Sequence, residues 1–91
     1  MILYTLNQPN LNTLKRCIEL MRANDMLLLV ADAVTLCLQP NAQVLLQTVQ
    51  HAYLKDDLLA RGLAHPEAER QCTYEQWVQW TIEADQIFRW R

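Results

Sequence analysis

Three cysteines, Cys17, Cys37 and Cys72, supply the thiol groups of this chain that could act as nucleophiles or metal ligands. They are odd in number and widely spaced, and no Cys-x-x-Cys pair occurs. Neither His51 nor His65 has a second donor at metal-ligand spacing, so we expect no metal site. In a reducing compartment the cysteines should stay reduced, and such a cysteine is most often a small buried hydrophobic residue.

The acidic residues do not form an obvious catalytic pair. Asp32 follows an apolar run and is expected to cap the helix that begins one residue later. Asp56 and Asp57 are expected to complement a helix dipole, and Arg61 lies four residues after Asp57, so an ion pair is predicted. Because no nucleophile–base pair, metal cluster or Gly-rich phosphate loop is visible, we expect neither a cofactor nor enzymatic activity of the chain alone.

Length and composition predict one small domain, residues 1–91, that meets a partner chain. Hydrophobic residues make up 52% and charged residues 20%, which is too apolar for a disordered chain. The net charge is −2 and no basic stripe occurs, so direct nucleic-acid binding is not expected. The start of the chain lacks the features of a signal peptide, and the longest apolar run, 26–31, is too short to span a bilayer. These features predict a soluble cytoplasmic protein without a membrane partner.

Apolar periodicity and turn residues predict alternating strands and helices. Strands are expected at 2–6, 26–30, around 52–54, at 71–72 and at 86–90. Helical segments are expected from 11 to 23–25, at 33–38, 41–47 and 57–61, and after a capping box at Thr73–Gln76. Strands and helices that alternate with short connections favour a mostly parallel sheet of about five strands in a three-layer α/β domain. Functional groups should gather at the carboxyl ends of these strands, near Asn7, Asp32 and Lys55.

The run Tyr53–Leu63 carries the most specific pattern. It reads Tyr-Leu-x-x-Asp-Leu-x-Ala-Arg-Gly-Leu, and Gly62 stands where a helix C-terminus needs a residue free to take positive φ. The pattern resembles a segment of the TusB/DsrH family, and the resemblance extends from Ile2 to Trp90. Members of that family are subunits of cytoplasmic sulfur-relay complexes that pass persulfide sulfur between proteins. The resemblance implies a compact DsrEFH-like three-layer α/β fold.

The resemblance implies a mainly architectural subunit that assembles with TusC-like and TusD-like sister subunits. Such a hetero-oligomer accepts sulfur from a small carrier protein and delivers it towards the 2-thiouridine of the tRNA wobble position. The alternative is a DsrH-like persulfide carrier in dissimilatory sulfur oxidation. Aligned through Leu14–Ile18, Cys17 falls where DsrH proteins of sulfur oxidisers carry a cysteine. A stand-alone metabolite-binding α/β domain is a weaker third possibility, because no phosphate-binding loop is visible.

Four residues are predicted to lie at subunit interfaces: Arg61, Trp80, Phe88 and Trp90. Arg61 belongs to the family motif, whereas the three aromatic residues add more apolar surface than a domain of this size can hide. Trp77 is expected to pack in the core, and the isolated chain is expected to self-associate. Where the family usually has Asp-Gly, this chain has Asp32-Ala33, which disfavours a tight turn with positive φ at residue 33.

Overall fold

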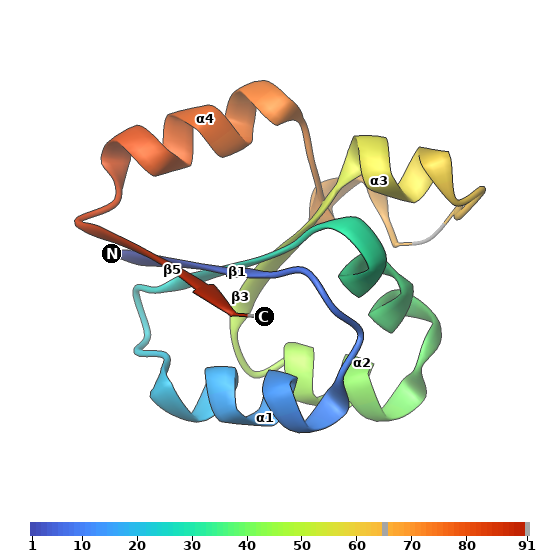
Figure 1. Cartoon of the computed structure of the whole chain (residues 1–91), viewed down its shortest axis with the longest axis horizontal. Coiled ribbons are helices and arrows are strands. Elements are labelled where there is room, and N and C mark those ends of the chain that lie inside the picture. The colour runs from blue at the N-terminus through green and yellow to red at the C-terminus, as the bar shows by residue number, and fades with distance from the viewer. Residues whose placement is uncertain (65, 91) are drawn as a thin grey trace.

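A parallel five-stranded sheet forms the centre of the molecule in the computed structural model, which describes residues 1–64 and 66–90 (Figure 1). The strands lie in the order β4-β3-β2-β1-β5. Their bounds are Ile2–Leu6 for β1, Met26–Leu29 for β2, Gln50–Leu54 for β3, Gln71–Cys72 for β4 and Gln86–Trp90 for β5. The predicted fold class, a three-layer α/β domain with a sheet of about five strands, is confirmed.

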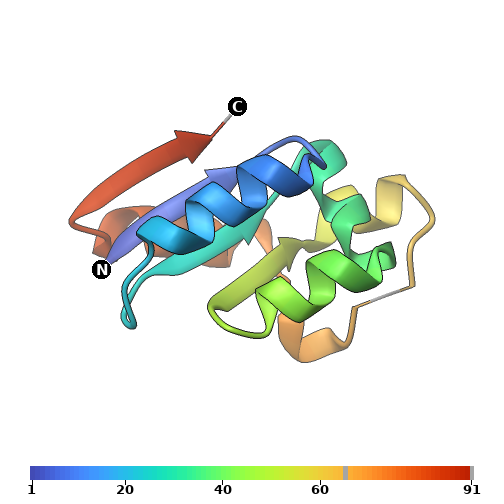
Figure 2. The same ribbon diagram turned by 90° about the horizontal axis from the view of Figure 1, so that it is seen from below.

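Helices cover both faces of this sheet. Helices α1 (Leu11–Leu20) and α2 (Pro40–Leu46) lie on one face, and α4 (Tyr74–Glu83) lies on the other (Figures 1 and 2). The 3₁₀ helix η1 (Ala31–Leu38) follows β2, and helix α3 (Lys55–Ala60) follows β3. A short 3₁₀ helix, η2 (Ala68–Arg70), lies directly before β4. Within residues 1–64 and 66–90, no helix has both the length and the apolar character needed to cross a membrane.

Local capping chemistry explains where two helices begin. The Asn10 side chain accepts a hydrogen bond from the Thr13 N–H, which satisfies a free donor of the first turn of α1. At α4, the Thr73 hydroxyl accepts from the Gln76 N–H while the Gln76 side chain accepts from the Thr73 N–H. This reciprocal arrangement confirms the predicted capping box.

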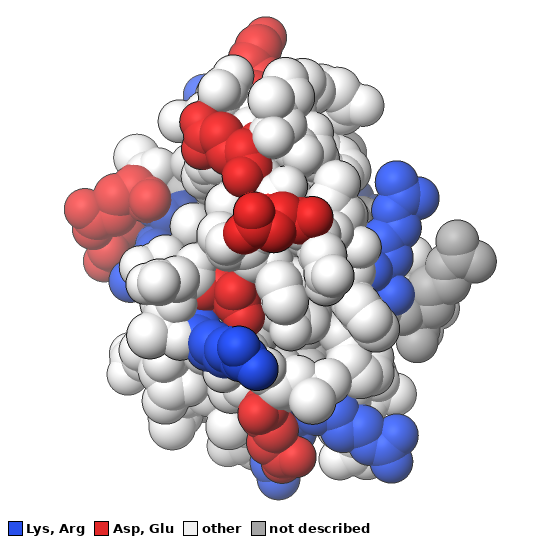
Figure 3. All heavy atoms as spheres, turned by 90° about the vertical axis from the view of Figure 1, so that its left-hand side faces the viewer, with Lys and Arg blue, Asp and Glu red and all other residues white. Residues whose placement is uncertain are grey.

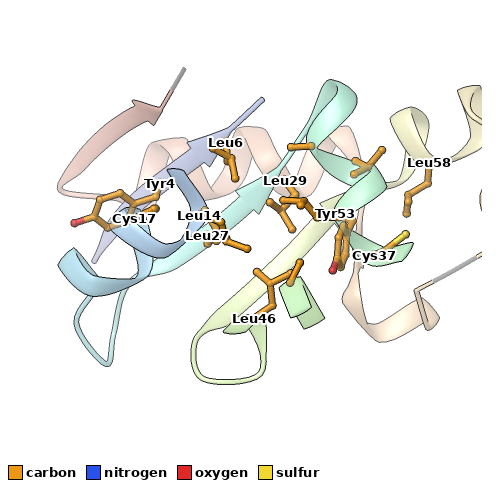
Figure 4. Close-up of a cluster of buried hydrophobic side chains, with 14 residues drawn as sticks. Tyr4, Leu6, Leu14, Cys17, Leu27, Leu29, Cys37, Leu46, Tyr53 and Leu58 are labelled. Atoms are coloured by element: carbon orange, nitrogen blue, oxygen red, sulfur yellow. The ribbon is translucent and has the colours of Figure 1, made fainter. Parts of the chain in front are cut away.

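Two apolar clusters lie on opposite faces of the sheet. The larger joins β1, β2 and β3 to α1, α2 and η1, and Figure 4 shows Leu6, Leu14, Leu27 and Leu29 pointing into it. The smaller lies under α4, and Trp77, Trp80 and Ala84 are partly buried against it. Its buried residues come from the strands and from the residue that follows β2: Leu3, Leu28, Val30, Ala52, Leu54 and Cys72. Strand β2 is buried on both faces because it contributes to both clusters, as its continuous apolar run predicts.

A buried carboxylate fixes the amino-terminal edge of the sheet. Asp25 Oδ1 accepts from the Ile2 N–H at 2.8 Å, and Asp25 Oδ2 accepts from the Arg22 N–H at 2.9 Å. Burial acts to raise the pKa of Asp25, but hydrogen bonds from the N–H groups of Arg22 and Ile2, together with the positive charges of the amino terminus and Arg22, hold that pKa below its ordinary value. Asp25 therefore joins the turn after α1 to the start of β1, and α1 ends at Leu20 rather than at the predicted 23–25.

The predicted capping role of Asp32 is wrong. The helical segment begins at Ala31, earlier than expected, and its N-cap is Val30, without a side-chain cap. Asp32 lies inside the first turn of η1 and pairs with Arg61 instead. The preceding strand accordingly ends at Leu29, one residue earlier than predicted.

Candidate functional site

A polar network lies at the carboxyl edge of the sheet, where β2 and β3 end. Arg61 Nη2 and Nε donate to Asp32 Oδ1 at 2.7 and 3.2 Å, and Arg61 Nη1 donates to the Asp57 carbonyl oxygen at 3.1 Å. Asp57 Oδ2 in turn accepts from the Ala31 N–H at 2.6 Å. These bonds tie α3 to the start of η1 and hold the two connections as one unit.

The predicted Arg61–Asp57 ion pair is present but long, with 4.0 Å between Arg61 Nη1 and Asp57 Oδ1. The shorter ionic contact is with Asp32, at 2.7 Å. Sequence spacing along a single helix could not reveal this partner, because Asp32 and Arg61 lie on different elements. Arg61 remains partly exposed at this edge, so its role at a subunit interface stays a prediction.

Ala31 adopts a left-handed conformation, with φ of 51°. This conformation costs a residue with a Cβ atom about 1–2 kcal/mol relative to ordinary backbone. The hydrogen bond from the Ala31 N–H to Asp57 helps to hold it. Positive φ therefore occurs in this turn at Ala31, two residues before residue 33, where the family usually has glycine.

Replacing Ala31 by glycine is expected to raise the free energy of unfolding by about 0.5–1 kcal/mol, because glycine adopts positive φ without a steric penalty. The measurement is chemical denaturation followed by circular dichroism. Ala60→Gly, at an exposed helical position of α3, is the matched control and should lower stability by about 1 kcal/mol. Equal destabilisation by both substitutions would contradict the role assigned to the Ala31 backbone.

All three cysteines remain thiols and are buried, with exposed fractions of 0% for Cys17, 2% for Cys37 and 1% for Cys72. Burial raises the pKa of Cys17 to about 12 and that of Cys72 to about 11, and it also raises the pKa of Cys37. Cys17 packs on the inner side of α1 among Tyr4, Leu14 and their neighbours (Figure 4). Since the thiolate is the nucleophile, all three side chains are poorly suited to attack on sulfur.

Cys37 differs from the other two thiols because it lines a cavity of about 310 Å³, together with His51, Tyr53, Glu67 and Arg70. His51 is buried, and its burial lowers its pKa, so the imidazole is neutral at pH 7. Its Nδ1 lies 3.1 Å from the Val49 carbonyl oxygen, so Nδ1 carries the proton in this contact. No sequence pattern joins these residues, because they come from η1, β3, the connection after α3 and η2.

Helix α4 carries apolar side chains on two sides. Trp77 and Trp80 face the smaller cluster, whereas Tyr74, Val78 and Ile82 follow each other at four-residue spacing along the exposed side. Ile82 is 72% exposed. We name Tyr74, Val78 and Ile82 the outer stripe of α4. The four-residue spacing of these side chains is visible in the sequence, but the sequence alone does not show that they lie on the side of α4 away from the sheet.

The predicted interface residues of the last strand occupy the opposite face of the sheet. Phe88 is 50% exposed, and Trp90 is partly buried against the larger cluster. The Phe88 ring centroid lies 5.9 Å from that of Tyr4 and 5.7 Å from that of Trp90. Tyr4, Phe88 and Trp90 thus form an aromatic row along the edge of the sheet.

Charged side chains of both signs are interspersed on the side of the molecule drawn in Figure 3. Most of that side is neither acidic nor basic: acidic groups lie over its upper and central part, Lys and Arg side chains lie mainly lower down and at its sides, and neither sign covers it continuously. Nucleic-acid backbones attract continuous basic surfaces. The side drawn in Figure 3 therefore carries no continuous basic surface.

Comparison with known proteins agrees with the fold and the sequence pattern. A family model described as "DsrH like protein" matches residues 9–87. No curated protein is similar enough to match the chain. Among solved structures, the crystal structure of the ychN protein from E. coli shares the fold, with a TM-score of 0.75 and 24% identity over 98% of this chain and 97% of that chain. The chain belongs to the DsrH-like family and is a DsrEFH-type sulfur-relay protein.

Proposed function

We propose that this protein is a mainly architectural subunit of a cytoplasmic sulfur-relay complex that passes persulfide sulfur towards 2-thiolation of the tRNA wobble uridine. Its partners in this proposal are TusC-like and TusD-like sister subunits, with a small sulfur-carrier protein and the tRNA-thiolation machinery acting on the assembly. The chain alone is proposed to catalyse no reaction. The observation that supports the architectural role is the burial of all three thiols.

Sulfur transfer between proteins requires a thiolate that a partner's cysteine can reach. Cys17 has no exposed surface, and with a pKa of about 12 only about one thiol in 10⁵ would be ionised at pH 7. Its neighbours are apolar side chains of the larger cluster, which offer no positive charge to lower that pKa. A carrier thiol on a sister subunit fits these properties better than Cys17 does.

The outer stripe of α4 and the partly exposed Trp80 support a role in assembly. Helix α4 has no buried residue, although it carries two tryptophans and several other apolar side chains. An amphipathic helix normally buries its apolar side, and the outer stripe would be buried by a sister subunit packed on α4. Arg61 would meet a sister subunit at the carboxyl edge of the sheet.

Replacing Cys17 by serine is expected to leave tRNA thiolation in cells unchanged, because the persulfide would be carried by a sister subunit. The measurement is the 2-thiouridine content of total tRNA nucleosides by mass spectrometry, in a deletion strain that expresses the variant. Cys17→Ala serves as the matched control for the cost of a buried hydroxyl group. Cys37→Ser should also be mild, with no more effect than ordinary repacking of the core.

Loss of 2-thiouridine in both Cys17 variants, with the protein still soluble and bound to its sisters, would overturn the architectural proposal. That result would instead favour the DsrH-like carrier in which Cys17 holds the persulfide. Intact mass of each co-purified chain after persulfide loading would then identify the loaded thiol directly.

A further inference from the structure

Strand β5 leaves one edge of the sheet open. It is the last strand in the order β4-β3-β2-β1-β5 and pairs with β1 alone. Figure 2 shows no other described element beside its outer edge. Backbone N–H and C=O groups along such an edge are a template for pairing with another strand. The opposite edge is formed by β4, which has only two residues and offers a much shorter template.

The outer edge of β5 carries few of the features that protect an edge strand. Its sequence, Gln-Ile-Phe-Arg-Trp, contains no proline and no lysine, and its register with β1 runs from Ile2–Gln86 to Leu6–Trp90 without a bulge. Ile87 and Phe88 are exposed large apolar residues on the two faces of this strand. Charged residues, prolines and bulges normally keep such edges from pairing, and here Arg89 is the one charged residue.

We propose that β5 pairs antiparallel with β5 of a second copy of this chain, around a two-fold axis at Phe88, so that the two sheets become one. A two-fold axis perpendicular to the sheet keeps each face of the sheet on the same side in both copies. Phe88 then lies opposite Phe88 of the partner subunit, and Ile87 lies opposite Arg89 of the partner subunit. This inference goes beyond the sulfur-relay proposal, and it assigns the predicted interface residues Phe88 and Trp90 to contact between copies.

Side-chain chemistry favours this register over the two registers in which the axis is shifted by one residue. The aromatic row of Tyr4, Phe88 and Trp90, with centroid separations of 5.9 and 5.7 Å, continues across the axis through the two Phe88 rings. Aromatic cross-strand pairs stabilise antiparallel sheets, and like charges placed opposite each other destabilise them. A shift of the axis to residue 89 would set two Arg89 side chains against each other. A shift to residue 87 would separate the two Phe88 rings.

A second copy fits this edge because the strand complements itself. In this register Phe88 meets Phe88 of the partner subunit, Ile87 meets the aliphatic part of Arg89 of the partner subunit, and Trp90 meets the aliphatic part of Gln86 of the partner subunit. No two charges of equal sign are opposed. Isologous pairing of this kind closes after two copies and leaves no further open edge at β5. The outer stripe of α4 and Arg61 remain available to a sister subunit.

Sedimentation equilibrium of the whole chain at micromolar concentration tests the association. We expect a dimer for the wild type and at least a tenfold weaker dimer for Phe88→Lys, because lysine at an edge strand disfavours pairing. Val44→Lys is the matched control, since Val44 is 67% exposed on α2, far from β5 in sequence, and should dimerise as the wild type does. Circular dichroism establishes that both variants are folded.

Disulfide formation tests the register. Phe88→Cys should crosslink rapidly to a covalent dimer when two thiols are oxidised by oxidised glutathione, because residues directly opposite in antiparallel strands have Cβ atoms about 4.5–5.5 Å apart. Ile87→Cys, which lies opposite Arg89 of the partner subunit, should crosslink slowly. A monomeric wild type, equal loss of dimer in both lysine variants, or faster crosslinking of Ile87→Cys would overturn the proposal. None of these outcomes bears on the Cys17 test of the sulfur-relay role.

Discussion

Replacing Asp25 by alanine is expected to lower the free energy of unfolding by about 3 kcal/mol. The carboxylate is buried and accepts one hydrogen bond from the Ile2 N–H and one from the Arg22 N–H. Hydrogen bonds to a charged group contribute about 1.5–3 kcal/mol each, and their loss leaves donors without a partner at the start of β1. Urea denaturation monitored by circular dichroism measures the change. Asp56→Ala, at an exposed position of α3, is the control and should cost less than about 1 kcal/mol.

The same carboxylate predicts how stability depends on pH. Because the pKa of Asp25 is lower in the folded chain than in the unfolded chain, its contribution is complete above the unfolded value of about 4 and is lost as the pH falls through the folded value. The Asp25→Ala variant should therefore lose less stability than the wild type when the pH is lowered from 7 into this range. An identical acid dependence of the two proteins would contradict the assigned role.

Replacing Ile82 by alanine is expected to weaken binding to sister subunits by about 2 kcal/mol, or roughly 30-fold, with a stability change within about 0.5 kcal/mol. Ile82 is 72% exposed at the end of the outer stripe of α4, so its truncation leaves the core intact. Trp80→Ala is expected to weaken binding by a similar amount but also to lower stability by about 2 kcal/mol, since Trp80 packs on the smaller cluster.

Co-purification of tagged sister subunits and isothermal titration calorimetry would measure binding, and thermal unfolding of the isolated chain would measure stability. Val44→Ala, an exposed apolar position on α2, is the matched control and should change neither quantity. If Ile82→Ala binds sister subunits as tightly as the wild type does, the outer stripe of α4 is not the contact surface.

The order and type of the main elements could be predicted because the periodicity and capping signals are local. The two-residue strand Gln71–Cys72, the capping box at Thr73 and the last strand, Gln86–Trp90, occur where the sequence places them. Local signals do not say which apolar side of a helix meets the sheet. Helix α4 has apolar residues over more than half of its circumference, so the assignment of Trp80 and Ile82 to different sides required the sheet itself.

The candidate site was harder to predict because its contacts join distant segments. Asp32 stands at a sequence position typical of a helix N-cap. Its carboxylate instead accepts a hydrogen bond from Arg61, which lies at the end of α3. Ala31 has no sequence feature that indicates positive φ, since alanine disfavours it, and the turn is supported by Asp57. Burial of Cys17 could be predicted, because a cysteine on the apolar side of a helix is most often buried. A role of Cys17 in sulfur transfer stays a prediction.

The strand order also has a consequence for folding kinetics. The pairs β1–β2, β2–β3 and β3–β4 join strands that are consecutive in the chain, whereas β5 returns to β1 and sets residue 86 beside residue 2. The entropy of closing so long a loop must be overcome before this pairing stabilises the chain, so β5 is expected to dock after the other four strands. Until then the edge of β1 is open. The last step of folding therefore creates the edge at which two copies are proposed to meet, so folding and association should be coupled in time.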